Sequence, residues 1–126
     1  MSHTLQDLTE LLLNAARKSG ADDADAMAIQ GQSLSINVRG GQLEQAERAE
    51  GIDIGLRVLI GQRQASVSAS DINASTISEM AERAVAMANE APIDPYIVLA
   101  DCAALAQSWD IAALELCDPT PEPSPN

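Results

Sequence analysis

The feature that most constrains the fold is a run of alternating apolar residues, broken by glycines, over residues 33–71. Leucine, isoleucine, valine or alanine occupies alternate positions through much of it, and the pattern stops at Gly40-Gly41 and again at Gly61-Gln62. Alternation with a period of two predicts strands with one buried face, and the glycine breaks predict turns between antiparallel neighbours. The sequence therefore predicts an antiparallel β-meander, and this stretch contains no catalytic motif.

The breaks divide the predicted sheet into short strands. We expect a short first strand, followed by the four strands of the meander, over residues 26–30, 33–39, 42–49, 51–60 and 62–69. The strand over residues 42–49 has the weakest apolar face, because Glu44, Glu47 and Arg48 lie in it. Charged side chains protect an edge strand from aggregation, so we expect this strand at an edge of the sheet. It is also our candidate edge for binding an extended peptide by strand addition.

A helix precedes the predicted sheet. Thr4 is its N-cap, Asp7 takes the acidic position of a capping box, and Gly20 ends it. The acidic segment that follows, residues 20–24, is a predicted loop. An apolar stripe at helical spacing marks the buried face of this helix and consists of Leu5, Leu8, Leu12, Ala15 and Ala16.

A second helix follows the sheet. Its N-cap is either Asn73 or Ser75, and it ends near Asn89, before Pro92. Together with the strands, the two helices predict an α+β fold, a curved antiparallel β-meander packed by two α-helices. The buried stripe of the second helix consists of Ile77, Met80, Ala81, Ala84, Val85 and Ala88.

The predicted domain covers residues 1–117, because a chain of 126 residues is normally one domain. Residues 100–107 are expected to form one or two short helical turns. Proline at every second position from Pro119 predicts an extended linker or tail over residues 118–126. A linker at this place suggests that the chain is the opening part of a longer protein.

Composition excludes several functional classes. The net charge of −12, from 19 acidic and 7 basic residues, argues against nucleic-acid binding and against an anionic membrane surface. No stretch of the sequence has the length and hydrophobicity of a membrane span, and acidic residues interrupt any signal-peptide core. Cys102 and Cys117 lack CxxC spacing, and we expect them to be reduced and structural in a cytoplasmic protein, although a disulfide between them stays open.

The residues reveal no catalytic centre. His3 is the only histidine, so neither an HExxH metal motif nor a histidine base is present. Asp22, Asp23 and Asp25 are interpreted as a solvated acidic loop, with weak binding of a hard cation as the alternative.

Serines and glycines that resemble functional motifs have simpler interpretations. Exposed strand serines without a partner base are not nucleophiles, and this applies to Ser66, Ser68 and Ser70. The glycines at positions 51, 55 and 61 do not form a phosphate-binding GxGxxG motif, and Gly55 is expected to allow close approach of another backbone or a helix. We therefore predict no catalytic, cofactor-binding or metal-binding residue in this chain.

Four stretches of the sequence resemble the N-terminal domain of the PmbA/TldD family, the "modulator of DNA gyrase" proteins. They are KSGADDA at residues 18–24, SLSINVRGG at 33–41, GIDIGLRV at 51–58 with GQR at 61–63 and SASD at 68–71, and DPY at 94–96 with LAD at 99–101 and LCDP at 116–119. The last of these resembles the PmbA (TldE) branch more than TldD. The chain departs from the family at Gly40-Gly41 and at Gln64-Ala65, where the family often has Asn-Gly and a glycine-containing turn.

The resemblance implies a role in proteolysis. In this family a PmbA/TldE subunit and a TldD subunit form a heterodimeric cytoplasmic metallopeptidase, which is linked to processing of a microcin precursor and degradation of an antitoxin. The zinc motif, HExxxH, lies in TldD beyond this domain, so zinc is implied only in a TldD-like partner. The resemblance therefore implies a scaffold domain that contacts a TldD-like subunit and a peptide substrate. The alternative is a non-enzymatic binding or regulatory module, of the gyrase-modulator type, that acts without a metallopeptidase partner.

Overall fold

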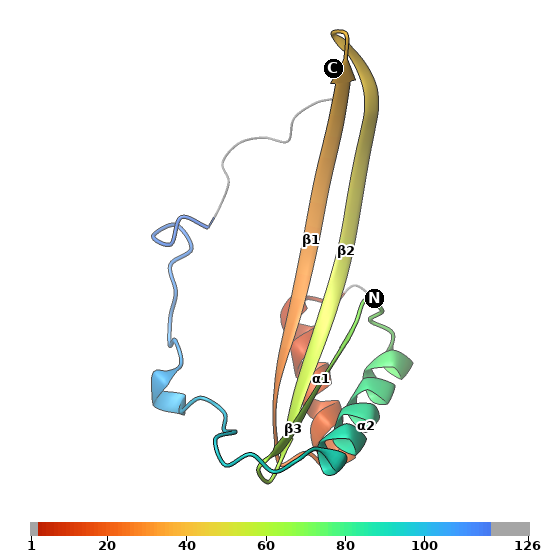
Figure 1. The fold of residues 1–126 in the computed structure, drawn as a ribbon. Helices are drawn as coiled ribbons and strands as arrows, with labels where there is room; N and C mark the ends of the chain where they lie inside the picture. The colour runs from red at the N-terminus through yellow and green to blue at the C-terminus, as the bar shows by residue number, and fades with distance from the viewer. Residues whose placement is uncertain (1–2, 117–126) are drawn as a thin grey trace. The chain divides into compact units, whose positions relative to one another are not determined.

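The computed structural model describes residues 3–116, so Cys117 and the predicted tail over residues 118–126 lie outside the described residues. The chain divides into two compact units. The first consists of the described residues up to Gly31 together with Glu50–Leu99, and the second of Gln32–Ala49 together with the described residues from Ala100 onward. The elements follow the order helix, three strands, helix and a short 3₁₀ turn (Figure 1).

Helix α1, Leu5–Ser19, begins and ends where the sequence predicts. The backbone N–H of Asp7 donates to the Thr4 hydroxyl at 3.1 Å, and the N–H of Thr4 donates to the Asp7 carboxylate at 2.8 Å. This reciprocal capping box satisfies two N–H groups that an uncapped helix leaves unpaired. Gly20 ends the helix with a φ of 104°, a left-handed conformation that favours glycine. Of the predicted stripe, Leu8, Leu12 and Ala16 are buried and Ala15 is partly buried, but Leu5 is exposed.

The sheet has three strands, β1 (Asp23–Arg39), β2 (Gln42–Ile60) and β3 (Arg63–Ala69), in the order β1-β2-β3. β2 and β3 are antiparallel, with pairs that run from Ile54↔Ala69 to Ile60↔Arg63. The turns that join the strands contain Gly40, Gly41 and Gly61, all with positive φ. The antiparallel meander is therefore confirmed.

The predicted number of strands is wrong. The segments 26–30 and 33–39 are parts of one strand, β1, and the segments 42–49 and 51–60 are parts of one strand, β2. The loop predicted at residues 20–24 is shorter, because β1 already begins at Asp23. Gly31, between two predicted strands, and Gly51, at the start of another, lie inside strands and do not have positive φ.

Helix α2, Ala74–Glu90, is N-capped by Asn73, the first of the two predicted positions. The Asn73 side chain makes no capping hydrogen bond; instead the Asp71 carboxylate accepts from the Thr76 hydroxyl at 2.7 Å and from the N–H of Asn73 at 3.0 Å. At the other end, the Arg63 guanidinium of β3 donates to the Asn89 carbonyl at 2.7 Å. A cation is favourable near the C-terminal carbonyls of a helix.

The core lies in the first unit, where α2 packs against β3 and α1 packs against α2. Both helices lie beside the part of β2 that pairs with β3 (Figure 1). The α+β fold class, with an antiparallel sheet packed by two helices, is therefore confirmed. The buried core residues are Leu8, Leu12, Ala16, Ile54, Leu56, Val58, Ala65, Ile77, Met80, Ala81, Ala84 and Ala88.

The second unit contains few buried side chains. In its hairpin, residues 32–49, the Arg39 guanidinium and the Glu44 carboxylate form an ion pair at 3.2 Å across the Gly40-Gly41 turn. The described residues of its other part, 100–116, include a 3₁₀ turn, Cys102–Ala104, in agreement with the short helical turn predicted in this region. The Cys102 thiol is free and exposed.

Candidate functional site

The first candidate surface is the outer face of the sheet, opposite the helices. Because side chains alternate along a strand, Gly55 and Arg57 of β2 face away from the core that Leu56 and Val58 enter. On this face lies a shallow depression of about 450 Å³. Its lining includes Asp25 and Met27 from β1, Gly55 and Arg57 from β2, and Ser66 and Ser68 from β3.

Arg57 on the outer face makes side-chain hydrogen bonds to both neighbouring strands. Its Nε and Nη2 donate to the two carboxylate oxygens of Asp25 at 2.9 and 2.5 Å, and its Nη1 donates to the Gln64 side chain at 3.3 Å. The hydrogen bonds that Arg57 donates to the Asp25 carboxylate raise the pKa of Arg57 above its ordinary value, so the guanidinium stays charged. The bidentate pair fixes the direction of the Arg57 side chain and balances its charge.

The three acidic residues predicted to form a solvated loop have different partners. Asp22 accepts a hydrogen bond from the N–H of Gly61 at 2.8 Å, and Asp25 lies in β1 and binds Arg57. Asp23, the first residue of β1, is exposed. Within residues 3–116, no group of three His, Cys, Asp or Glu side chains is placed to hold a metal ion.

Two of the three predicted strand serines lie in β3, and Ser70 lies just beyond its end. Ser66 and Ser68 are exposed on β3, and the Ser70 hydroxyl donates to the Asp53 carboxylate at 2.6 Å. A Cβ atom at Gly55 would lie 3.9 Å from the Val67 carbonyl, which is an ordinary contact distance. No described part of the chain therefore comes close enough to require glycine at position 55.

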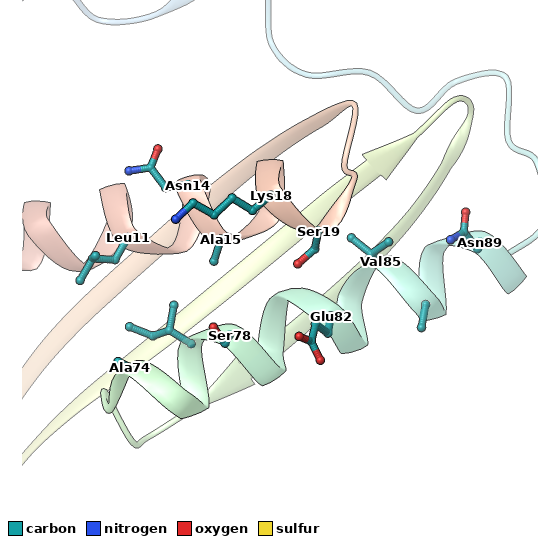
Figure 2. A pocket seen from close by; sticks show the side chains of 12 residues that line it. Leu11, Asn14, Ala15, Lys18, Ser19, Ala74, Ser78, Glu82, Val85 and Asn89 are labelled. Atoms are coloured by element: carbon teal, nitrogen blue, oxygen red, sulfur yellow. The ribbon is translucent and has the colours of Figure 1, made fainter.

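The second candidate surface is a groove of about 700 Å³ between α1 and α2 (Figure 2). Ala15, Ile77 and Val85 supply apolar surface, whereas Lys18 and Glu82 place opposite charges on the two helices. Such a groove can take apolar side chains of a partner between polar margins. The sequence alone does not predict this groove, because its residues come from two helices far apart in the chain. The one indication in the sequence is Leu11, an apolar residue of α1 outside the predicted buried stripe.

The third candidate surface consists of the open strand edges. β2 lies between β1 and β3 in the sheet, but the pairing with β3 covers only residues 54–60. The predicted edge strand, residues 42–49, is thus the part of β2 that β3 does not reach. β1 is first in the sheet order, so among the described strands only β2 lies beside it.

A three-stranded antiparallel sheet covered by two helices defines a two-layer α+β domain. The chain belongs to the PmbA/TldD family, because its residues 24–88 match the family model described as PmbA/TldA metallopeptidase domain 1. The resemblance seen in the sequence is thereby confirmed. A search of curated proteins gives no match.

Solved structures that share this fold include the following two. A candidate modulator of DNA gyrase from Bacteroides thetaiotaomicron is 18% identical, with a TM-score of 0.75 over 92% of this chain and 28% of that one. TldE from Thermococcus kodakarensis is also 18% identical, with a TM-score of 0.61 over 73% of this chain and 21% of that one. The chain thus spans roughly a quarter of the length of these proteins.

Neither of the two described α-helices has the length and hydrophobicity needed to cross a membrane.

Proposed function

We propose that this chain is the N-terminal scaffold domain of a PmbA/TldE-like subunit in a cytoplasmic TldD/TldE-type metallopeptidase complex that processes peptides. The domain itself supplies no catalytic residue. The observation that carries the proposal is the match of residues 24–88 to the first domain of the PmbA/TldA metallopeptidases. The likeness in fold to TldE supports the choice of the TldE-like branch.

The arrangement of polar groups agrees with a scaffold role. Of the clustered aspartates Asp22, Asp23 and Asp25, Asp22 accepts from the N–H of Gly61 and Asp25 pairs with Arg57. Zinc would therefore come with a TldD-like partner, and this domain would contact that subunit and help to enclose the peptide. The outer sheet face, the groove between the helices and the strand edges are the surfaces available for such contacts.

Co-purification with metal analysis tests this proposal. The chain would be tagged and produced with and without a TldD-like protein encoded by the same genome, and zinc would be measured in each purified sample. We expect a stable complex that contains zinc, and chain produced alone without zinc. A chain that never retains the TldD-like protein, or that binds zinc stoichiometrically alone, would contradict the proposal.

The alternative is a non-enzymatic binding or regulatory module of the gyrase-modulator type. The name of the Bacteroides neighbour, a candidate modulator of DNA gyrase, is the observation that favours it. The same purification separates the two functions, because the alternative predicts association with a target but neither a TldD-like subunit nor zinc.

A further inference from the structure

β1 is an edge strand whose middle lacks the usual protection. Natural sheets cover open edges or place charged residues and prolines on them, because unpaired N–H and C=O groups bind other strands. Residues 26–38 of β1 include no charged residue and no proline. In contrast, the part of β2 beyond the reach of β3 contains Glu44, Glu47 and Asp53. β1 carries charges only towards its ends, at Asp23, Asp25 and Arg39, and has none over residues 26–38.

The part of β1 in the first unit, residues 23–31, also exposes apolar side chains. Met27 is 62% exposed and Ile29 is 53% exposed, both on the outer face, while Ala24, Ala26 and Ala28 pack against the core. The core side thus fixes the strand in place. The outer side and the open edge remain accessible to another polypeptide.

Three glycines on the outer face of the sheet also support the conclusion that another polypeptide can approach this edge. Glycine inside a strand is unfavourable and often marks a place where another backbone or a ligand comes close. Gly31, Gly51 and Gly55 lie inside strands without positive φ, and a Cβ atom at any of them would meet no described atom closer than 3.9 Å. Neither turn geometry nor packing among the described residues explains glycine at these positions, and the missing side chains leave the surface beside β1 open to another chain.

The charges near this edge indicate what kind of polypeptide can bind there. Asp22 immediately precedes β1 and Asp23 begins it, with one cation, Arg17 of α1, lining the same small pocket. The positive charge of Arg57 is already balanced by Asp25. A second copy of a chain with a net charge of −12 would bring like charges together. We propose that the open edge of β1 over residues 23–31 binds, by strand addition, an extended segment of a partner protein, uncharged at its centre and basic at the end beside Asp22 and Asp23. This inference rests on the sheet alone and does not depend on the metallopeptidase proposal.

A designed peptide probes this edge directly. The probe is a fluorescent nine-residue peptide of alternating threonine and valine with lysine at both ends, and its affinity for the full chain is measured by fluorescence polarisation. Two matched peptides are compared with it: one has glutamate at both ends, and one has N-methyl groups at alternate residues. Because N-methylation removes backbone donors, it abolishes strand pairing but leaves the apolar side chains in place. We expect both changes to weaken binding by about tenfold or more, roughly 1.4 kcal/mol.

Matched protein variants locate the binding edge. Ile29→Lys, and independently Met27→Lys, place a protective charge on β1 at exposed positions, so both are expected to fold normally and to lose about tenfold or more in affinity. Leu43→Lys makes the same change on the exposed part of β2 and is expected to bind as the parent does. Circular dichroism and thermal unfolding verify that each variant is folded.

Several results would overturn the proposal. They are undetectable binding of the lysine-ended peptide, full binding of the N-methylated peptide, equal binding of the glutamate-ended peptide, and equal losses for Ile29→Lys and Leu43→Lys. Sedimentation supplies a further outcome: a dimer of the parent that Ile29→Lys dissociates would identify a second copy, and not a basic partner segment, as the occupant.

Discussion

The two ends of β2 are parts of one strand but have opposite surroundings. Over residues 54–60, Ile54, Leu56 and Val58 alternate into the core and are almost completely buried. Over residues 42–49, every side chain is exposed, including Leu43. The exposed part shows that a strand can form with only a pairing neighbour and a turn. The buried part shows that a core also requires helices over one face of the sheet. We infer that the buried part supplies stability and that the exposed part is available for contacts.

The largest difference is expected between two leucine truncations in this strand. Leu56→Ala removes a side chain that is 2% exposed and is expected to cost about 2–5 kcal/mol in the free energy of unfolding. Leu43→Ala truncates a side chain that is 48% exposed and is expected to change stability by about 0.5 kcal/mol or less. Urea unfolding of both variants measures the difference. Equal losses would show that the exposed part of β2 also belongs to the core.

A smaller effect is expected from the helix that covers the buried part. Thr4→Ala removes the hydroxyl that accepts from the N–H of Asp7 and is expected to cost about 1 kcal/mol. Thr4→Ser is the control, because it keeps the acceptor. A Thr4→Ala variant as stable as the parent in urea would mean that the first turn of α1 contributes nothing to the core.

Two ion pairs between β1 and β2, Arg57–Asp25 and Arg39–Glu44, allow a second comparison of the two parts of β2. Arg57 and Asp25 form a bidentate pair in which the Arg57 side chain is one-third exposed, whereas the Arg39 side chain of the pair with Glu44 is 82% exposed. Double-mutant cycles are expected to give a coupling of up to about 1 kcal/mol for the first pair and close to zero for the second. Both couplings should fall with added salt. A larger coupling for Arg39 and Glu44 than for Arg57 and Asp25 would contradict the conclusion that the buried part of β2 supplies stability and the exposed part does not.

The smallest effect concerns Asp71, before α2. The Thr76 hydroxyl and the N–H of Asn73 hold the pKa of Asp71 below its ordinary value of 3.8. Because the folded-state pKa is the lower one, the stabilisation is complete above the unfolded-state pKa and is lost as the pH falls through the folded-state pKa. Asp71→Asn should therefore be less stable than the parent at neutral pH, and the difference should vanish in acid. Glu79→Gln, in α2, is the control for the loss of one charge. A loss of stability in Asp71→Asn that persists in acid would contradict this explanation.

The helices and the fold class could be predicted because their signals are local. The capping pair Thr4 and Asp7, the stop at Gly20 and the apolar stripe of α2 depend on residues within a few positions of one another. Leu5 was wrongly placed in the buried stripe, because it lies in the first turn of α1, where the neighbouring elements do not cover it.

The strand boundaries could not be predicted because glycine permits a turn but does not require one. Gly40, Gly41 and Gly61 adopt positive φ and form turns, whereas Gly31 and Gly51 continue their strands. What distinguishes the two groups is pairing with neighbouring strands, which no local pattern reveals. For the same reason, the sequence pointed to residues 42–49 as an edge but did not single out β1, whose open side follows only from the sheet order.

The most direct test of the scaffold role is hydrogen exchange of the chain, alone and with a TldD-like subunit. Amides of residues 54–60 are expected to exchange slowly in both samples, because this part of β2 lies in the core. Amides of residues 42–49 are expected to exchange fast in the isolated chain and more slowly in the complex. If the TldD-like subunit leaves exchange unchanged throughout the chain, the account of this domain as a scaffold that contacts its partner is contradicted.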